Sequence, residues 1–412
     1  MAKILEHHGK QLMKKMGIAV PEGRACKNIE EVMEAAREYG GKVMIKALVP
    51  VGGRGKVGAV KKAFGAQEAA EIAASLIGSK VKEYPCEEVL VEKCLEATRE
   101  LYIAITFDSL TRGPMVMVSA TGGVDIEEMF KNDPASIKKF YVHILQGLRE
   151  YQARQLWEEL GLESELIRSA ADMLVRLYKV FRCYDLRLIE VNPVIQTAEG
   201  KFYAADVVLT VDDEALFRQP DLKDIARYGQ EMAWRPPTLL EQQMIEADQL
   251  DPYRGTSRFL EFDSGDIGFM CGGGGGSLVM MDTLIKYGGK PKNYTEMGGN
   301  PTERKLVALA RTVLSQPGLK GFIRAGNISS NTQVDLVAKA VVQAVRELGI
   351  DPKRFPMVVR ATGLNDEEAR KIFDEAGISY FGEEYTMVQA AKKLIELVNQ
   401  QEGERAQGEH TG

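Results

Sequence analysis

Residues 43–56 read VMIKALVPVGGRGK, an apolar run that contains one lysine and ends in a basic glycine loop. The apolar residues of Val43–Leu48 predict a short buried strand. In the loop Gly52–Lys56, glycines would let backbone N–H groups approach a phosphate closely, while lysine and arginine supply charge-matched donors. Flexible surface loops also have this composition, so a phosphate site and a plain loop both stay open from this stretch alone.

A second polar set lies on two predicted strands further along the chain. Residues 187–197 and 201–210 are expected to form a hairpin, with Asn192 on the first strand and Asp206 on the second. Carboxylate and amide oxygens are hard ligands that suit Mg²⁺ carrying nucleotide phosphates. A solvated polar hairpin edge would look the same, and the spacing does not separate the two interpretations.

Composition narrows the class of protein. The chain has 412 residues, of which 27% are charged and 45% hydrophobic, and its formal net charge is −6. This length corresponds to two or three domains, and the acidic balance argues against a nucleic-acid-binding surface. No apolar run approaches the roughly 20 residues that cross a bilayer. Scattered cysteines without metal-site spacing are typical of reduced thiols, so we expect a cytoplasmic protein with neither nucleic acid nor membrane as a partner.

The sequence pattern changes near residue 256. Residues 1–235 are expected to form one domain, and the polar, proline-containing stretch 236–256 a connector with room for one helix. From 257 to 398, strands and helices alternate with short connections, which predicts a doubly wound parallel sheet. Residues 399–412 lack apolar anchors and are expected to be disordered.

In order and spacing, several motifs resemble those of succinyl-CoA synthetase β subunits over residues 3–398. These motifs are Lys46, Gly52–Lys56, Glu92, Glu100–Tyr102, Thr121–Glu128, Glu190–Pro193, Asp206 and Ala215–Arg218. The resemblance implies an α/β chain with an N-terminal ATP-grasp domain, followed by a flavodoxin-like, doubly wound CoA-ligase domain.

The resemblance also implies roles for single residues. It assigns nucleotide binding to Lys46, Gly53, Arg54, Gly55, Glu92 and Glu100, and Mg²⁺ binding to Asn192 and Asp206. Glu190 would support the metal ligands. Two departures from the family pattern stand out: Val207 and Val208 follow the metal-binding aspartate where a small residue and a lysine are usual, and Pro50 stands where histidine is common.

The histidines are few and unevenly placed. They lie at positions 7, 8, 143 and 410, so residues 144–409 contain none. In the family, a phosphoryl group passes from ATP through a histidine to a carboxylate, which then reacts with CoA. The resemblance therefore implies no catalytic histidine on this chain and a separate α-type subunit that carries the phosphohistidine and binds most of the CoA. The assembly would be αβ or α2β2, and it would use ATP/ADP, Mg²⁺ and CoA.

The loops expected to hold the acid differ from those of succinate enzymes. Residues 298–302 read GGNPT and residues 324–332 read RAGNISSNT, which is closer to ATP-citrate lyase and citryl-CoA synthetase chains. Substrate or phosphate binding is assigned to Gly299, Asn327, Ser329, Ser330, Asn331, Thr332 and Arg360. Helix capping by serine and asparagine, and a surface ion pair of the arginine, are the simpler alternatives. We expect a small carboxylate that is more polar than succinate.

Two other functions remain open. A stand-alone ATP-grasp ligase would join a carboxylate to an amine without a partner, which leaves the C-terminal half without a role. A non-catalytic, nucleotide-sensing subunit would keep the fold without turnover, and Val207 and Val208 are the feature that favours it.

Overall fold

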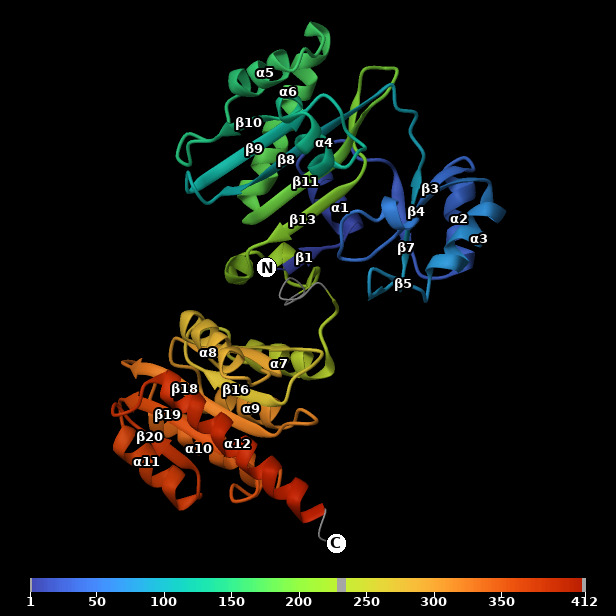
Figure 1. Cartoon of the computed structure of the whole chain (residues 1–412). Coiled ribbons are helices and arrows are strands. Elements are labelled where there is room, and N and C mark those ends of the chain that lie inside the picture. Colours follow the sequence, from blue (N-terminus) through green and yellow to red (C-terminus); the bar gives the residue numbers. More distant parts are fainter. Residues whose placement is uncertain (1, 228–234, 410–412) are drawn as a thin grey trace. The chain divides into compact units, whose positions relative to one another are not determined.

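The structure is a computed structural model that describes residues 2–227 and 235–409, with side chains as far as residue 404. The chain forms two compact units, Met1–Pro236 and Pro237–Gly412 (Figure 1). Each unit has its own hydrophobic core. None of the helices in the described ranges combines the length and the apolar character that a membrane span requires.

The first unit contains an eight-stranded sheet in the order β10–β9–β8–β11–β13–β1–β14, with β12 paired to β11. The strands are β1 (Ala2–Ile4), β8 (Arg99–Asp108), β9 (Gly113–Ser119), β10 (Lys138–Tyr141), β11 (Leu186–Gln196), β12 (Phe202–Ala204), β13 (Val207–Val211) and β14 (Ala226–Arg227). The helices with it are α1 (Glu6–Lys15), α4 (Ile126–Asn132), α5 (Glu150–Glu159) and α6 (Ser164–Cys183). Helix α6 packs on the sheet because Leu174, Leu177 and Phe181 share one buried face.

A second, antiparallel sheet of the same unit has the order β2–β7–β3–β4. Its strands are β2 (Gly23–Cys26), β3 (Lys42–Ala47), β4 (Val60–Phe64) and β7 (Val89–Lys93), and α2 (Ile29–Glu38) and α3 (Ala66–Leu76) lie beside it in Figure 1. Alanines such as Ala35, Ala36 and Ala69 form the core between these helices and the sheet, so the helices approach the strands closely. A short ribbon, β5 (Lys80–Val81) with β6 (Tyr84–Pro85), follows α3.

The hairpin predicted for residues 187–210 is confirmed, with one interruption. Strand β11 pairs antiparallel with β12 and with β13, and the chain leaves the ladder at Ala205 and Asp206 between them. On its other side, the register of β11 against β8 shifts between Val191 and Val194. Asp206 and Asn192 therefore both lie at breaks in the regular pairing, where their side chains are available for other contacts.

The second unit is a doubly wound parallel sheet, as predicted. Its strands follow the order β16–β18–β19–β20, all parallel. Strands β15 and β17 form a separate antiparallel pair, and the isolated parallel bridges Ile267–Pro291 and Gly272–Met297 lie between the β16 and β17 segments. The strands are β15 (Thr256–Glu261), β16 (Ile267–Cys271), β17 (Asn293–Gly298), β18 (Gly321–Ser329), β19 (Met357–Gly363) and β20 (Ser379–Phe381). The helices are α7 (Leu239–Gln249), α8 (Gly274–Lys286), α9 (Glu303–Leu314), α10 (Val334–Glu347), α11 (Asp366–Glu375) and α12 (Met387–Glu409).

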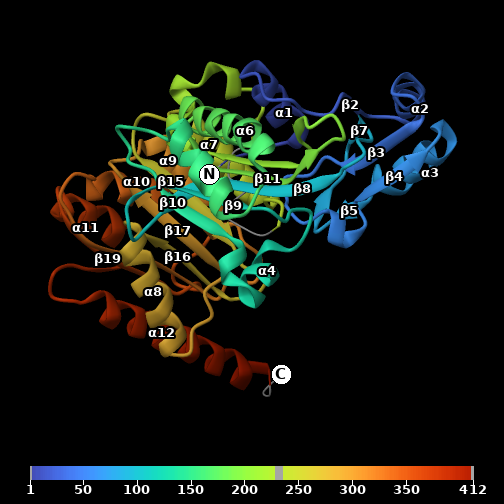
Figure 2. The ribbon, with the colours of Figure 1, turned by 90° about the horizontal axis from the view of Figure 1, so that it is seen from above.

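Separate apolar clusters cover the two faces of this sheet. One joins α9, α10 and α11 to the strands through residues such as Leu306, Val341 and Phe373. The other joins α8 and α12 to the opposite face through Met280 and Leu394. Figure 2 shows α8 and α12 on one side of β16 and β19, with α9 and α10 on the other. Ligands of such folds bind at the carboxyl edge of the strands.

Both segments expected to lie outside the two domains contain helix. Residues 236–256, expected to be a connector with room for one helix, contain helix α7, which begins with a capping box of Thr238 and Glu241 and places Met244 in the core of the second unit. The tail expected to be disordered from residue 399 continues α12 to Glu409, because its glutamine, glutamate and arginine residues are good helix formers. Residues 410–412 lie outside the described residues.

Candidate nucleotide and acid sites

Six charged side chains meet where the two sheets of the first unit adjoin. They are Glu6 and Lys10 on α1, Lys46 on β3, Arg54 in the glycine loop, Glu92 on β7, and Asp206 between β12 and β13. All except Asp206 are at most 5% exposed. We call these six residues the ion cluster.

Opposite charges alternate within the ion cluster. The contacting nitrogen and oxygen atoms lie 2.5–2.9 Å apart in the pairs Lys10–Glu6, Lys10–Glu92, Lys46–Glu6, Lys46–Glu92 and Arg54–Glu6, and Arg54 also contacts Asp206. Three cations thus face three carboxylates. The cluster is neutral as a whole, which makes the burial of so many charges tolerable.

These contacts fix the charge states. Burial alone would raise the pKa of Glu6, but Arg54, Lys10 and Lys46 outweigh this and hold that pKa well below its ordinary value of 4.5. Burial alone would lower the pKa of Lys46, and the charges of Glu6 and Glu92 raise it instead. The carboxylate therefore stays ionised and the ammonium stays protonated at neutral pH.

A pH dependence follows from the lowered pKa of Glu6. Its contribution to stability is complete above the ordinary value of 4.5 and is lost as the pH falls through the lower, folded value. We expect the stability difference between the wild type and a Glu6→Gln variant to be constant from pH 8 to about pH 5 and to shrink below that. Thermal unfolding of the full chain over this range measures the difference, and one that grows in acid would contradict the assignment.

Backbone contacts tie the cluster to the predicted metal ligands. Lys10 and Lys46 each donate to the carbonyl oxygen of Ala205, both at 2.6 Å, and so hold the chain immediately before Asp206. The backbone N–H of Asn192 donates to the carbonyl oxygen of Asp206 at 3.0 Å. The structure thus brings Lys46, predicted to contact phosphate, close to Asp206 and, through the Asp206 backbone, to Asn192 on β11.

Asn192 and Glu190 lie beside Asp206 on β11. The Asn192 side-chain oxygen accepts the N–H of Gly123 at 2.7 Å, and its amide donates to Val124. Burial raises the pKa of Glu190, and the nearby charge of Asp206 adds to this. Burial likewise raises the pKa of Asp206, with a further contribution from Glu6. A divalent cation here would offset both the desolvation and the repulsion between carboxylates, so the donor set fits Mg²⁺.

The protein alone offers such a cation few ligands. In the part of the chain that the structure describes, no group of three or more His, Cys, Asp or Glu side chains is placed to hold a metal ion. A cation at Asn192 and Asp206 would therefore take other oxygens from water and phosphate, which is how Mg²⁺ binds in nucleotide sites.

The other predicted nucleotide residues surround this region. Gly53 is exposed with φ of 66°, where glycine is favoured, and Lys82 holds the loop by donating to the Gly52 carbonyl oxygen at 2.7 Å. Gly55 is exposed, and a Cβ there would meet nothing within 4 Å. The carboxylate of Glu100 lies so close to Gly123 that a Cβ at position 123 would clash with it. Glu92, which the resemblance also assigns to nucleotide binding, is buried in the ion cluster.

In the second unit, a cavity of about 350 Å³ lies at the carboxyl edge of the parallel sheet. It is lined by Gly275, Gly276, Val279, Asn327, Arg360, Thr386 and Met387. Arg360 donates to the carbonyl oxygens of Gly326 at 2.5 Å and Tyr385 at 2.8 Å. Its recorded partners are backbone groups, so the surface ion pair considered from the sequence is absent within the described residues.

The first turn of α8 completes one wall of this cavity. The helix begins at Gly274, after the N-cap residue Gly273, and a Cβ on Gly275 would meet nothing within 4 Å. The space beside this glycine is therefore open on the side of the cavity. A guanidinium facing a helix N-terminus can hold an anion such as a carboxylate.

The remaining residues of the predicted acid loop are placed differently. Ser329, Ser330, Asn331 and Thr332 precede α10, whose N-cap is Gln333 without a side-chain cap. Helix capping therefore does not explain these residues. Of the predicted acid-binding residues, Asn327 and Arg360 line the cavity together, whereas Gly299 packs near Gly255.

Sequence reasoning did not identify Glu6 and Lys10. They are four residues apart on α1, on the same buried face as Met13. A pair of opposite charges within an apolar face was the available signal.

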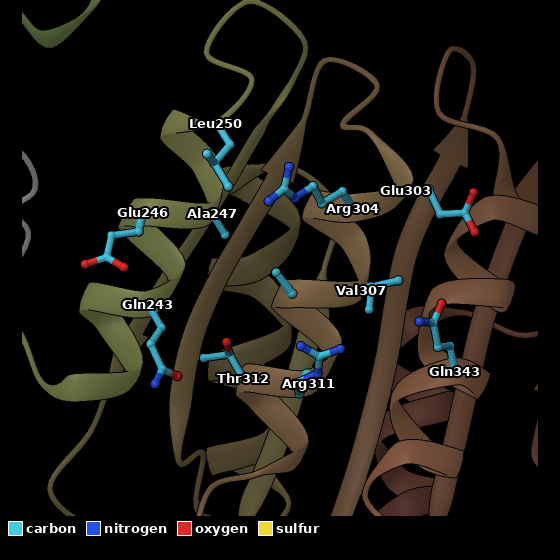
Figure 3. A pocket seen from close by; sticks show the side chains of 11 residues that line it. Gln243, Glu246, Ala247, Leu250, Glu303, Arg304, Val307, Arg311, Thr312 and Gln343 are labelled. Carbon is cyan, nitrogen blue, oxygen red and sulfur yellow. The ribbon is translucent and has the colours of Figure 1, made fainter.

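The second unit also contains a cavity of about 930 Å³ between α7, α9 and α10, which the sequence did not suggest (Figure 3). None of the predicted site residues lines it.

The matches to known proteins extend over almost the whole chain. Residues 3–196 match the ATP-grasp domain model, and residues 240–397 match the model for the ATP citrate lyase citrate-binding domain. The chain is 34% identical over 397 residues to the β subunit of the ADP-forming succinate–CoA ligase of Desulfurococcus amylolyticus, covering 96% of this chain and 99% of that one. It is 33% identical to subunit β 2 of the Archaeoglobus fulgidus ligase, covering 97% and 100%.

A solved structure has the same fold over a similar length. It is the ATP citrate lyase of Methanothrix soehngenii in complex with citrate and coenzyme A, with a TM-score of 0.77 and 21% identity, covering 96% of this chain and 99% of that one. This likeness supports the order of the two units along the chain and the fold of each.

Proposed function

Because the chain belongs to the family of ADP-forming succinate–CoA ligase β subunits, we propose that it is the nucleotide-binding subunit of an ADP-forming acid–CoA ligase. The observation that carries this is the ion cluster, which joins Lys46, Arg54 and Asp206 at one place in the first unit. The cavity at Arg360 supplies a separate place for a carboxylate in the second unit.

The first step would take place at the ion cluster. Lys46 and Arg54 are the cations that would meet the phosphates, in competition with Glu6 and Glu92, which hold them in this structure. Asn192 and Asp206, with Glu190 beside them, would hold Mg²⁺, which screens the phosphate charge when it is bound.

Phosphoryl transfer then needs a nucleophile that residues 144–409 do not supply, since they contain no histidine. We assign it to a histidine of an α-type partner subunit, in an αβ or α2β2 assembly. Its imidazole nitrogen would take the γ-phosphoryl group as the bond to ADP breaks. The carboxylate of the acid would take that group next to form an acyl phosphate. The CoA thiolate, bound mainly by the partner, would then displace phosphate and give acyl-CoA.

The acid itself would bind at the cavity next to Asn327 and Arg360. The arginine supplies a charge-matched donor for a carboxylate, and the amide can bond a hydroxyl or a second carboxylate. A plain dicarboxylate such as succinate would not need these additional hydrogen-bond donors. We therefore propose an acid that is more polar than succinate, used in the cytoplasm.

Radioactive label in the γ-phosphate of ATP tests this scheme. In the complex with its co-purified partner, we expect label on a partner histidine, and its discharge when CoA and a suitable acid are added together. Hydroxylated and tricarboxylic acids are expected to discharge it faster than succinate. Turnover by the isolated chain with amine acceptors would favour a stand-alone ligase instead. Absence of both labelling and turnover would favour a nucleotide-sensing subunit.

A further inference from the structure

Two strand-to-helix turns lie side by side at the carboxyl edge of the parallel sheet. One joins β18 to α10 and carries the predicted acid loop, residues 327–332, and the other joins β19 to α11. Their backbones bond directly, because the N–H of Leu364 donates to the carbonyl oxygen of Ser329 at 3.2 Å and the N–H of Val334 donates to that of Leu364 at 2.9 Å. A Cβ on Gly363 would lie 2.2 Å from the Ser329 carbonyl oxygen, so this close approach requires glycine.

Asn365 adds a side-chain hydrogen bond between the two turns. It is the N-cap residue of α11, where asparagine ordinarily caps its own helix, but within the described chain its side chain makes no such bond. Instead, its amide donates to Oδ1 of Asp335, in the first turn of α10, at 3.0 Å. Its backbone has a φ of 64°, in the left-handed region that asparagine tolerates better than most residues. The side chain of Asn365 therefore serves the neighbouring helix.

Asp335 is a buried carboxylate, 6% exposed, and both of its oxygens accept hydrogen bonds. Oδ1 accepts the Asn365 amide, and Oδ2 accepts Lys339, one turn further along α10, at 3.0 Å. Burial alone would raise the pKa of Asp335, but the hydrogen bonds from Asn365 and Lys339 outweigh this and lower it. The carboxylate therefore stays ionised at neutral pH, and its hydrogen bond with Asn365 is charge-assisted.

This hydrogen bond connects the two sides of the predicted acid site. Asn327 lies on the first turn and Arg360 on β19, and both line the cavity. Residues 329–332, assigned to substrate or phosphate, lie between Asn327 and the helix that carries Asp335. A shift of the first turn of α10 away from the start of α11 would therefore move the acid loop relative to Arg360.

We propose that Asn365 and Asp335 are positioning residues for the second step of the proposed reaction, because they hold the acid loop in place relative to Arg360. In that step, a carboxylate oxygen of the acid attacks phosphorus while the bond from phosphorus to the partner's imidazole nitrogen breaks. The reacting groups must be held within reach of each other, and a displacement of about 1 Å can cost about 10²-fold in rate. This inference rests on the proposed function and adds to it two residues outside the set that lines the cavity.

The test compares the two half-reactions in the complex of this chain with its co-purified partner. The partner histidine is loaded with label from the γ-phosphate of ATP, and discharge of the label is followed after addition of CoA with citrate or, in parallel, with succinate. The variant Asn365→Gly permits the left-handed backbone and removes the amide. We expect its plateau rate of discharge to fall about 10- to 100-fold. The half-saturating acid concentration should change less than about threefold, and the loading rate should stay within about twofold of the wild type.

An exchange of the two side chains isolates the hydrogen bond. Asn365→Asp places a second carboxylate against that of Asp335, so the discharge rate should fall at least as far as in Asn365→Gly. In Asn365→Asp/Asp335→Asn, the amide and the carboxylate have changed places, so the bond can form in the reverse direction and most of the rate should return. Thr238→Gly removes the N-cap side chain of α7 in the same unit, and it should leave both rates unchanged.

Several results would overturn the proposal. In Asn365→Gly, these are a loss of less than about fivefold in the plateau rate of discharge, or an equal loss in loading and discharge. Failure of the exchanged pair to discharge faster than Asn365→Asp would also contradict it. So would a higher half-saturating acid concentration at an unchanged plateau rate, since that result indicates binding and not positioning.

Failure of the proposed function would look different. The wild-type complex would then take up no label from ATP, or would keep its label in the presence of CoA and both acids. If the wild type is loaded and discharged normally and Asn365→Gly matches it, only the inference about Asn365 and Asp335 fails.

Discussion

Replacing Glu6 by glutamine is expected to destabilise the first unit by about 3–5 kcal/mol, the range seen when one member of a buried ion pair is removed. Glu6 is the only carboxylate of the ion cluster that contacts all three cations, Lys10, Lys46 and Arg54. A neutral amide would leave three buried positive charges facing two negative ones. Calorimetric unfolding of the full chain would show this as a lower transition temperature of the first unit.

A double variant provides the control for that prediction. In Glu6→Gln/Lys10→Met, one charge of each sign is removed and the cluster is neutral again. The loss should therefore be smaller than the sum of the two single losses, which signals coupling between neighbouring sites. If Glu6→Gln lowers the free energy of unfolding by less than about 1 kcal/mol, Glu6 contributes no more than an exposed surface ion pair does. That result would contradict the prediction.

The sequence suggested residues for a nucleotide site but not how these residues contact each other. Lys46, Arg54 and Asp206 stood out because their residue types suit phosphate and metal chemistry, and the structure brings them together. The role of Glu92 as an ion partner of Lys10 and Lys46 depends on how β7 and α1 meet. Such a contact between residues 82 positions apart leaves no periodic trace in the sequence.

In the second unit, local patterns were informative where a strand or helix buries one face. Strands β16, β18 and β19 are runs buried on both faces, which is the pattern that predicts the strands of a parallel sheet. Helix α9 carries a local signal too, since Leu306, Leu309, Ala310 and Val313 form a buried stripe of helical spacing. Strand β17 leaves a weaker signal, because Thr295 and Asn293 are buried by hydrogen bonds to β16 rather than by apolar packing.

Lys46→Gln is expected to lower the rate of label transfer from ATP to the partner histidine by about 10²–10³-fold, the loss typical of removing one donor that stabilises developing charge. Lys46 is 5% exposed and its ammonium is held in place by Glu6 and Glu92, so positioning it against a phosphate would cost little conformational entropy.

Lys46→Arg keeps the charge and should recover part of the rate. Lys62→Gln, a lysine on the exposed side of β4, should transfer label at the wild-type rate. Rates measured below the unfolding transition of each variant separate this effect from lost stability. A folded Lys46→Gln protein with transfer within tenfold of wild type would show that the ammonium serves the ion cluster alone and that Arg54 is the main phosphate contact.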